Sequence, residues 1–430
     1  MRRKAKKGRV LFVGQMYYHM WYLSRELRKL GWKADVLNWD VNPSHEMYYH
    51  GEDFKFTYDP SNFKKDFFKQ TVFYIKALFQ YDIFHFSGAH NMRCGGTVAY
   101  GFNELELRIN YACNVLVWYI NYILKRLRLP QLGVCNFRFP PYIETRLLKL
   151  LGKKIVYSTN GCLDGISKSS YLLGSEPVPC DICAWRDVHA VCSDERNMEW
   201  GRLRNSLANY ICTASGNLSD YNDAPHVHLV PEFACLDTEF WRPDLEVPPE
   251  YQLHYPPETV KIYHAVGNFD IRTSSSNGQN IKCSHVYLPL IEQLKQEGHP
   301  VELIFAKDVP NKEVRYYQAQ ADIVVDMLTF GIFGTNAKEA MMLGKPVVCY
   351  LRPEWLENLR REVPGYVEEI PVVNATPETV HDVLVDLIRN PDKRQEIGRK
   401  SREFAVKWLS AEAGAERIDR IYMELLGRKQ

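Results

Sequence analysis

The chain has 430 residues, of which 46% are hydrophobic and 25% are charged, and its formal net charge is +2. This length exceeds one ordinary core and predicts two domains of roughly 200 residues each. The composition argues against a disordered chain. The near-neutral charge argues against a protein built to bind nucleic acid, so we expect no nucleic-acid partner.

The N-terminal residues and the cysteines bear on the cellular compartment. Residues 1–9 are basic but lack the apolar core of a secretory signal. The chain nevertheless contains 11 cysteines, which without such a signal favour a reducing compartment over a disulfide framework. We therefore expect a cytoplasmic protein, either free or held peripherally at the cytoplasmic face of the membrane.

Residues 1–245 predict a Rossmann-like domain. A strand at 9–13, a turn at Gly14, a helix at 19–30 and a strand at 34–38 are the opening of a doubly wound sheet. Further strands are expected at 83–86, 154–158 and 210–213. Gly14 lies at the first strand–helix turn, where backbone can approach a phosphate, so it is a candidate nucleotide contact.

The most apolar segment of this domain, residues 111–124, reads YACNVLVWYINYIL and is followed by Lys125, Arg126 and Arg128. It is shorter than the 18–20 apolar residues that a membrane span needs. A buried helix and an interfacial helix with basic flanks both fit this pattern.

A cluster of cysteines lies in residues 160–205, which have few apolar runs. Cys180 and Cys183 form a C-x2-C pair, Cys192 follows, and Cys162 or His189 could complete a set of four. Four such ligands suit a structural zinc, an iron–sulfur cluster has the same ligand count, and four ordinary thiols remain the third interpretation. Of these, zinc is the metal that the sequence favours.

Residues 246–410 predict a second α/β domain after a proline-rich connector at 247–257. Strands are expected at 261–266, 301–306, 323–326 and 347–351, and helices at 286–297, 335–343, 377–388 and 393–408. The loop after the first strand is long and polar and contains Gly267, Arg272 and Lys282. An arginine fork and a lysine charge suit the oxygens of a diphosphate, although a solvated loop would also carry such charges.

The segment 321–351 carries the clearest signal in the chain. It reads as a buried strand, a turn with Gly331 and Gly334, a helix that starts at Thr335, and a second buried strand. A strand that feeds a glycine turn and a helix N-terminus holds phosphate or ribose at the carboxyl edge of a parallel sheet. Glu339, in that helix, has a carboxylate that could accept from two ribose hydroxyls.

The same segment resembles the glutamate-x7-glutamate element of retaining glycosyltransferases with the GT-B fold, of the group 1 type. That element commonly reads E-G-F-G-x-x-x-x-E-A-M-A-x-G-x-P-V-V. The residues in register are Phe333, Gly334, Glu339, Ala340, Met341, Gly344, Pro346, Val347 and Val348. The sequence departs from the pattern at the first glutamate, which is Gly331, and at the following glycine, which is Ile332.

The resemblance implies a GT-B fold: two Rossmann-like, doubly wound domains that face each other across a cleft, with a C-terminal helix (411–430) that crosses back to the first domain. It also implies that Glu339 contacts the ribose of a nucleotide-sugar donor, and that Arg272 and Lys282 stabilise the departing diphosphate. His85, at a strand end of the acceptor-side domain, is a candidate catalytic residue. GT-B enzymes generally use protein cations in place of a divalent ion, so we expect no catalytic metal.

The function that follows is transfer of a sugar from a nucleotide sugar to a lipid-linked or polysaccharide acceptor, with retention of anomeric configuration. Two rival hypotheses remain. One is a nucleotide-sugar epimerase on the same fold. The other, suggested by Gly331 in place of glutamate, is a catalytically silent, metal-stapled assembly subunit.

Overall fold

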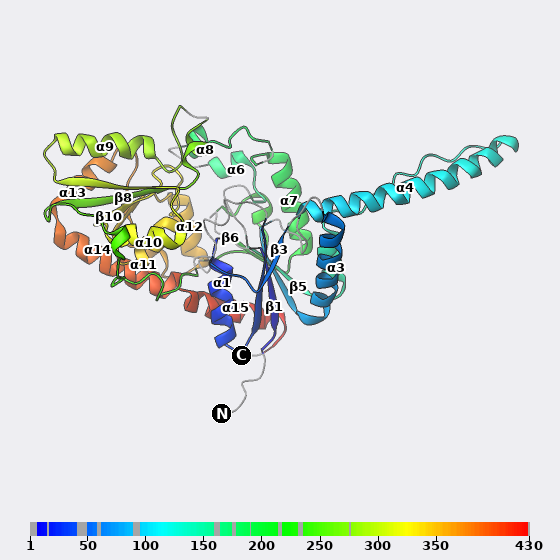
Figure 1. The fold of residues 1–430 in the computed structure, drawn as a ribbon, viewed down its shortest axis with the longest axis horizontal. Helices are drawn as coiled ribbons and strands as arrows, with labels where there is room; N and C mark the ends of the chain where they lie inside the picture. The colour runs from blue at the N-terminus through cyan, green and yellow to red at the C-terminus, as the bar shows by residue number, and fades with distance from the viewer. Residues whose placement is uncertain are drawn as a thin grey trace, which may run out of the picture.

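The computed structural model describes residues 7–14, 17–40, 50–57, 62–88, 95–158, 164–173, 178–189, 191–213, 217–230, 235–274 and 277–428. The described residues form two parallel sheets, with seven strands in the first and five in the second. Each sheet is covered by helices on its faces, and the two α/β units lie side by side (Figure 1). The predicted pair of doubly wound domains is confirmed.

The first sheet has the strand order β3-β2-β1-β4-β5-β6-β7. Its strands are β1 (Arg9–Val13), β2 (Lys33–Asp40), β3 (Phe54–Thr57), β4 (Ile83–Ser87), β5 (Lys154–Ser158), β6 (Tyr210–Thr213) and β7 (Val227–Leu229). The central strands β1 and β4 are almost wholly buried. A continuous apolar run is what a parallel strand with helices on both faces requires, which is why the sequence located them correctly.

The helices of the first domain are α1 (His19–Lys29), α3 (Phe63–Gln80), α4 (Gly95–Arg126), α5 (Ile143–Leu150), α6 (Lys168–Leu172) and α7 (Asp194–Leu207). Helix α1 connects β1 to β2 and packs its Leu23 and Leu27 into the core. Basic residues Arg28 and Lys29 occupy its last turn, where they complement the helix dipole.

The second sheet has the order β12-β11-β10-β8-β9, with strands β8 (Val260–Val266), β9 (Val301–Lys307), β10 (Ile323–Val325), β11 (Val347–Cys349) and β12 (Val373–Asn374). Its helices are α8 (Phe269–Thr273), α9 (Ser284–Gln296), α10 (Asn311–Ala319), α11 (Thr335–Met342), α12 (Pro353–Glu362), α13 (Val380–Arg389) and α14 (Pro391–Phe404). The predicted helix at 393–408 ends earlier, because a π-helical turn (Ala405–Leu409) follows α14.

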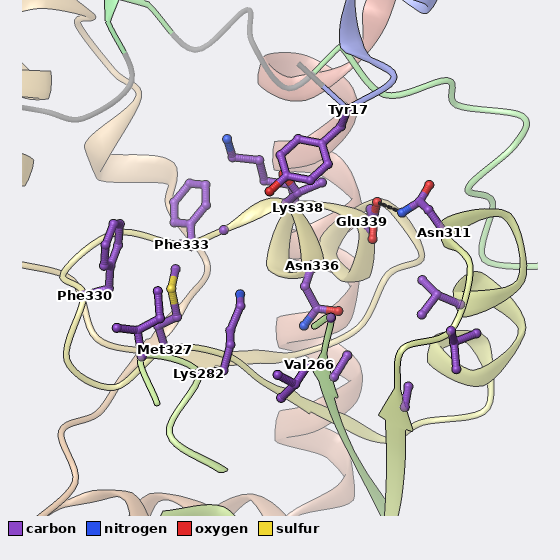
Figure 2. A pocket seen from close by; sticks show the side chains of 18 of the residues that line it. Tyr17, Val266, Lys282, Asn311, Met327, Phe330, Phe333, Asn336, Lys338 and Glu339 are labelled. Carbon is purple, nitrogen blue, oxygen red and sulfur yellow. Dashed lines mark hydrogen bonds between the residues drawn. The ribbon is translucent and has the colours of Figure 1, made fainter. Parts of the chain in front are cut away.

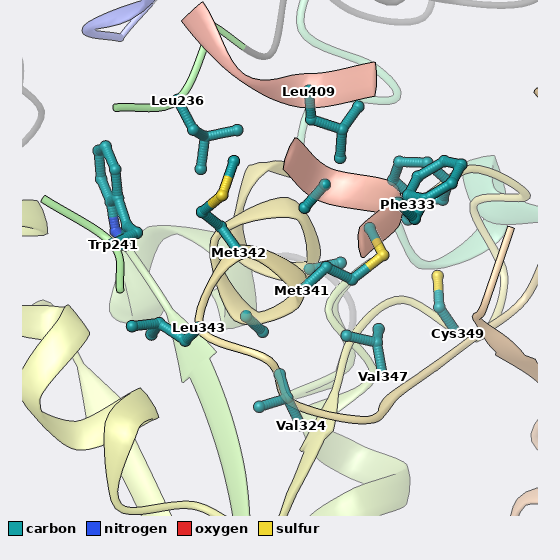
Figure 3. Packing of buried hydrophobic residues seen from close by; sticks show 14 of the residues in the cluster. Leu236, Trp241, Val324, Phe333, Met341, Met342, Leu343, Val347, Cys349 and Leu409 are labelled. Atoms are coloured by element: carbon teal, nitrogen blue, oxygen red, sulfur yellow. The ribbon is translucent and has the colours of Figure 1, made fainter. Parts of the chain in front are cut away.

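Helix α11 lies in the middle of the largest core cluster. Its Met341 and Met342 pack against Leu409 of the π-helical turn and against Leu236 and Trp241, which follow the last strand of the first domain (Figure 3). The helix that bears the family-like motif is therefore held by apolar contacts from three parts of the chain.

The last helix, α15 (Ala411–Leu425), packs on the first domain beside α1 (Figure 1). Its Ile418 and Tyr422 are fully buried in the same cluster as Val10 and Phe12 of β1. The chain enters the helix through a short bridge in which the Leu236 N–H donates to Leu409 and the Ala411 N–H donates to Leu236. The predicted crossover to the first domain is confirmed.

Helix α4 projects from the first domain, and residues 127–140 return along it as an extended segment (Figure 1). Tyr111 is 75% exposed and Trp118 is 63% exposed. Burial of segment 111–124, one of the two interpretations of the sequence, is therefore wrong. Among the described helices, none combines the length and apolar content needed to cross a bilayer.

Candidate active site

A pocket of about 290 Å³ opens at the carboxyl edge of the second sheet, facing the first domain (Figure 2). The ends of β8 and β9, the loop before α9, the turn after β10 and the start of α11 all contribute to it. Six residues predicted from the sequence line it together: Gly267, Arg272, Lys282, Gly334, Thr335 and Glu339. This is the edge at which parallel α/β sheets bind ligands.

Asp326 organises the turn between β10 and α11. It follows the strand directly, is 1% exposed, and accepts from the Gly334 N–H at 3.0 Å and from Lys282 Nζ at 2.9 Å. A Cβ at Gly334 would lie 3.2 Å from the Asp326 carboxylate and 3.3 Å from Lys282 Nζ. Glycine at this position thus lets one carboxylate fix both the helix start and the lysine.

The N-terminus of α11 faces the pocket through Gly334, Thr335 and Asn336. A helix start carries unpaired N–H groups and partial positive charge, which suit the oxygens of a phosphate. Gly334 is the N-cap residue in extended conformation, and no side chain caps the helix. A ligand oxygen can therefore take the place of a cap.

Three cationic side chains line the pocket. Arg272 donates from Nε to the Gly267 carbonyl at 2.8 Å, and its guanidinium lies 4.8 Å from the ring centre of Trp185 in the first domain. Lys282 is held by Asp326. The Lys338 ammonium lies 5.9 Å from the centre of the Phe333 ring, and burial lowers its pKa to about 8. A bound anion would favour its charged form.

Glu339 is 2% exposed and accepts two hydrogen bonds at Oε1, from the Tyr18 hydroxyl at 2.6 Å and from Asn311 Nδ2 at 2.7 Å. Burial raises the pKa of Glu339 to about 7, and the hydrogen bonds and the Lys282 charge offset only part of that effect. The carboxylate is thus positioned in the pocket before any ligand arrives (Figure 2).

Glu339 belongs to a hydrogen-bond chain that joins the two domains. Asn311 Oδ1 contacts His50 Nε2 at 2.7 Å, and His50 Nδ1 contacts the Tyr22 hydroxyl at 2.7 Å. Burial lowers the pKa of His50 to about 4, so its ring is neutral at physiological pH. Because an amide oxygen only accepts, Nε2 carries the ring proton and Nδ1 accepts from Tyr22.

Gly331, which stands where the family-like motif has its first glutamate, has a φ of +85°. A Cβ there would lie 2.7 Å from the Cβ of Arg352, whose own side chain is buried and donates to the Tyr171 carbonyl. The left-handed backbone and the packed neighbour both favour glycine. The loss of the glutamate is accompanied by a local structure that does not accommodate a side chain.

Two predicted site residues lie outside the pocket lining. His85 is 1% exposed in β4, bonds Tyr422 of α15 at 2.6 Å and also bonds Ser158. Burial lowers its pKa to about 3, and both ring nitrogens have protein partners. This geometry gives His85 a structural role and no access to a substrate. Gly14 has a φ of +81° and donates to Leu37 within the first sheet.

The cysteine segment lies beside the pocket and does not form a recognisable metal site. Within the described residues, no group of three or more His, Cys, Asp and Glu side chains is arranged to hold a metal ion. Cys180, Cys183 and Cys192 are free and half-buried, and Cys162 lies outside the described residues. The zinc and iron–sulfur predictions therefore gain no support. Trp185, just after Cys183, supplies the ring against which Arg272 lies.

The sequence did not identify five residues of the site: Tyr17, which lines the pocket from the first domain, and Tyr18, Asn311, Asp326 and Lys338. Asp326 carried a signal, since a carboxylate at the end of a buried strand is costly without a partner. Tyr18 and Asn311 carried none, because they meet Glu339 only in the folded chain.

Comparison with known proteins agrees with this geometry. Residues 287–404 match the family of Glycosyl transferases group 1. The chain carries a glycosyltransferase domain. This match includes β10, α11 and β11, and hence Asp326, Gly334 and Glu339. A comparison with curated protein sequences found no match.

Solved structures show the fold of the whole chain. Sucrose-phosphate synthase from Thermosynechococcus elongatus has a TM-score of 0.51 and 15% identity, covering 98% of this chain and 99% of its own. A protein named as a UDP-N-acetylglucosamine 2-epimerase from Listeria monocytogenes has a TM-score of 0.50 and 11% identity, with coverages of 99% and 98%. Anabaena HepE in complex with UDP has a TM-score of 0.50 and 10% identity, with coverages of 97% and 100%. The chain has the GT-B fold.

Proposed function

We propose that this glycosyltransferase takes a sugar from a nucleotide-sugar donor that binds in the pocket of the second domain. The observation that carries the proposal is the convergence of a buried carboxylate, a helix start and three cations at one sheet edge. The carboxylate, the helix start and Lys338 lie inside the segment that matches the family, and Arg272 and Lys282 lie before it. Glu339 would accept from the ribose hydroxyls, and the diphosphate would lie between the α11 N-terminus and Lys282. The UDP bound by Anabaena HepE supports this class of ligand.

In this mechanism the sugar–phosphate bond breaks toward an oxocarbenium-like state. The negative charge that grows on the leaving diphosphate is stabilised by Arg272, Lys282 and Lys338, together with the N–H groups at the start of α11. The acceptor hydroxyl attacks from the face that the diphosphate leaves, and its proton passes to a phosphate oxygen. Retention of configuration follows without a protein nucleophile, so neither His85 nor a glutamate at position 331 is needed for it.

We further propose that the acceptor is a sugar on a lipid carrier or on a growing polysaccharide. The first domain would supply its binding surface, with Tyr17 at the border between the donor pocket and that surface. The basic and aromatic character of the first domain between residues 107 and 143 supports an acceptor that is presented at a membrane.

The likeness to the Listeria protein keeps epimerisation of a nucleotide sugar as a second candidate function. Both reactions take place on the sugar of a bound nucleotide sugar, at or next to the carbon that bears the diphosphate. The same donor pocket therefore suits either reaction. The two differ in product: transfer yields a free nucleoside diphosphate, whereas epimerisation yields a new nucleotide sugar.

A thermal-shift screen against a panel of nucleotide sugars, followed by NMR analysis of the products, tests the proposal. Transfer predicts stabilisation by at least one donor and release of nucleoside diphosphate with an α-linked product from an α-linked donor. Accumulation of a free epimerised donor would favour the second candidate. Failure to bind any nucleoside diphosphate would favour a silent assembly subunit.

The cations provide a sharper test of the mechanism. Arg272→Ala and Lys282→Ala should lower kcat by more than they raise the donor KM, because the diphosphate charge grows toward the transition state. Arg315→Ala, an arginine of α10 that bonds the Phe240 carbonyl and is absent from the pocket lining, is the matched control. Wild-type turnover in both pocket variants would place the phosphate site elsewhere.

A further inference from the structure

Helix α4 and the segment that returns along it form a projection, which we call the arm and define as residues 105–139 (Figure 1). We propose that the arm is a monotopic membrane anchor that inserts into the interfacial region of a bilayer rich in anionic lipid. The proposal concerns a surface outside the donor pocket and does not depend on the transfer reaction.

The side of α4 that faces the return segment is polar. Each of three asparagines bonds both the N–H and the C=O of one residue of that segment, the pairs being Asn110 with Phe137, Asn114 with Cys135, and Asn121 with Leu132. The six distances lie between 2.6 and 3.0 Å. At these three positions the side-chain amides provide the backbone bonds that a neighbouring strand would otherwise provide.

The part of α4 that the return segment leaves exposed is apolar and aromatic. Its large exposed side chains are Leu105, Leu107, Tyr111, Val115, Leu116, Trp118, Tyr119, Tyr122 and Ile123. Leu116 is 60% exposed and Ile123 is 57% exposed. From Ile109 to Leu124 the helix contains no charged residue. Tyrosine and tryptophan among aliphatic residues are typical of the membrane interface.

This distribution is the reverse of that in a water-soluble helical hairpin, where apolar side chains face the partner and polar ones face water. It is the distribution expected in lipid, where an irregular backbone segment needs its polar groups satisfied from within the protein. The asparagine pairs supply that satisfaction at three residues of the return segment, and the exposed apolar side chains supply the contact with acyl chains. The bonding pattern therefore points to lipid over water as the surroundings of the arm.

The charge of the arm indicates which lipids it would bind. The arm has one acidic residue, Glu106 at its base, whose carboxylate accepts from the Phe139 N–H. Its basic residues are Arg108, Lys125, Arg126 and Arg128 on or just after α4 and Arg138 on the return segment. Basic residues beside an apolar face are attracted to anionic headgroups. A protein groove would also exclude water from the arm, so the binding experiments below separate lipid from a protein partner or a second copy of this chain.

The length of the uncharged stretch limits how the arm inserts. Residues 109–124 span about 24 Å of helix axis, which is less than the roughly 30 Å hydrocarbon core of a bilayer. The arm would therefore lie in, or dip into, one leaflet with its basic end at the headgroups. The acceptor-side domain would then stand against the same leaflet.

Vesicle flotation of the full chain tests the proposal. The protein should float with vesicles of phosphatidylcholine and phosphatidylglycerol and bind vesicles of phosphatidylcholine alone more weakly. Leu116→Glu/Trp118→Glu should abolish flotation, whereas the matched exposed-apolar control Leu173→Glu/Val406→Glu should float as the wild type does. Lys125→Glu/Arg126→Glu/Arg128→Glu should weaken binding to the anionic vesicles by on the order of a hundredfold.

A spectroscopic readout separates insertion from surface attraction. Brominated acyl chains should quench part of the tryptophan fluorescence of the wild type, and Trp118→Phe should remove that quenching while the protein still floats. Equal flotation of the wild type and the Leu116/Trp118 variant would overturn the proposal. So would a wild type that ignores every vesicle and forms a concentration-dependent dimer in sedimentation, which would assign the arm to a second copy.

Discussion

Glu339 combines a costly burial with a central place in the proposed donor site. A carboxylate that is almost fully buried and paired mainly with neutral donors is unfavourable in the free protein, which is why its pKa is raised. The folded state binds the proton more tightly than the unfolded chain. This residue therefore contributes stability at low pH, and that contribution is lost as pH rises from the ordinary pKa of glutamate through about 7.

The first prediction follows for Glu339→Gln. At pH 8 the variant should resist urea better than the wild type, by up to about 3 kcal/mol, because it carries no buried charge. At pH 4.5 the difference should vanish. The same variant should bind a nucleotide sugar more weakly by about 1–2 kcal/mol, since an amide is a weaker acceptor than a carboxylate. A variant that is less stable at pH 8 and binds equally well would contradict both halves.

The second prediction concerns the pH dependence of donor binding. Glu339 is ionised above about 7 and Lys338 is protonated below about 8, so UDP-glucose should bind most tightly between these values. Its diphosphate does not itself titrate in that window. Calorimetry from pH 5.5 to 9 should give a bell-shaped affinity. Glu339→Gln should flatten the acidic limb and Lys338→Met the alkaline limb, and limbs that persist in the variants would assign the titration to other groups.

At the scale of elements, the turn between β10 and α11 explains why the motif lacks its first glutamate. The backbone at Gly331 is left-handed and the space beside it is filled by Arg352, which reaches the Tyr171 carbonyl of the first domain. At this turn a polar side chain at the pocket is absent, and Arg352 occupies the space and contacts the first domain. The other end of the turn, at Gly334, leaves the start of α11 open to the pocket, as the proposed phosphate site requires.

The third prediction separates the two constraints at Gly331. Gly298 has almost the same φ, +86° against +85°, but a Cβ there would meet no atom within 4 Å. Gly298→Ala should therefore cost about 1–2 kcal/mol of stability from backbone strain alone. Gly331→Ala should cost about 1–3 kcal/mol more, because Arg352 has to move. Urea unfolding measures both losses of stability. Equal losses in the two variants would show that the Arg352 side chain moves aside at no cost.

The elements that the sequence predicted well are those whose formation depends on residues close together in the chain. Strands β5 and β6 have the predicted bounds because short buried apolar runs are bounded by polar turns, and α11 was predicted from its glycine turn. The short strands β3, β7 and β12 lie at the edges of the sheets and lack such runs. The arm was ambiguous because an apolar run has the same composition whether it faces a core or a membrane.

The site divides in the same way. The glycines, Glu339 and the cations of the donor loop were predicted because strand ends and helix starts converge at one sheet edge whatever the details of packing. Tyr18 is 321 positions from Glu339 and meets it only where the first domain packs against the second. Asn311 is 28 positions away and reaches Glu339 from α10 of the same domain. His85 lies outside the pocket lining because it is covered by α15, which comes from the far end of the chain.

At the scale of the whole molecule, α15 makes the two domains depend on each other. Tyr422 closes the first-domain core against His85, and Asp419 accepts from Trp32 Nε1 at 2.7 Å and pairs with Lys7. The connection from the second domain runs through the π-helical turn that also packs on α11. Helix α11 and the first-domain core are thus both packed against one continuous segment of chain, the π-helical turn and α15.

The fourth prediction tests that support. Tyr422→Phe removes the hydroxyl from buried His85 and should destabilise the first domain by about 1–3 kcal/mol in urea unfolding. Nucleotide affinity should stay within about twofold of the wild type, because the donor pocket is untouched. Tyr366→Phe, a buried tyrosine of the second domain, is the comparison. A loss of nucleotide binding in Tyr422→Phe alone would mean that α15 controls the geometry of the donor site.

The position of α15 also has a consequence for how the protein is made. Strand β1 leaves the ribosome roughly 400 residues before the helix that covers it, a delay of about 20–80 s at ordinary rates of synthesis. During that time the apolar face formed by Val10, Phe12 and Leu23 has no partner from α15. The first domain is therefore translated first, but its core is completed last, when α15 packs on it. Until the last helix arrives, this apolar face of the nascent N-terminal half is exposed to aggregation or to chaperone binding.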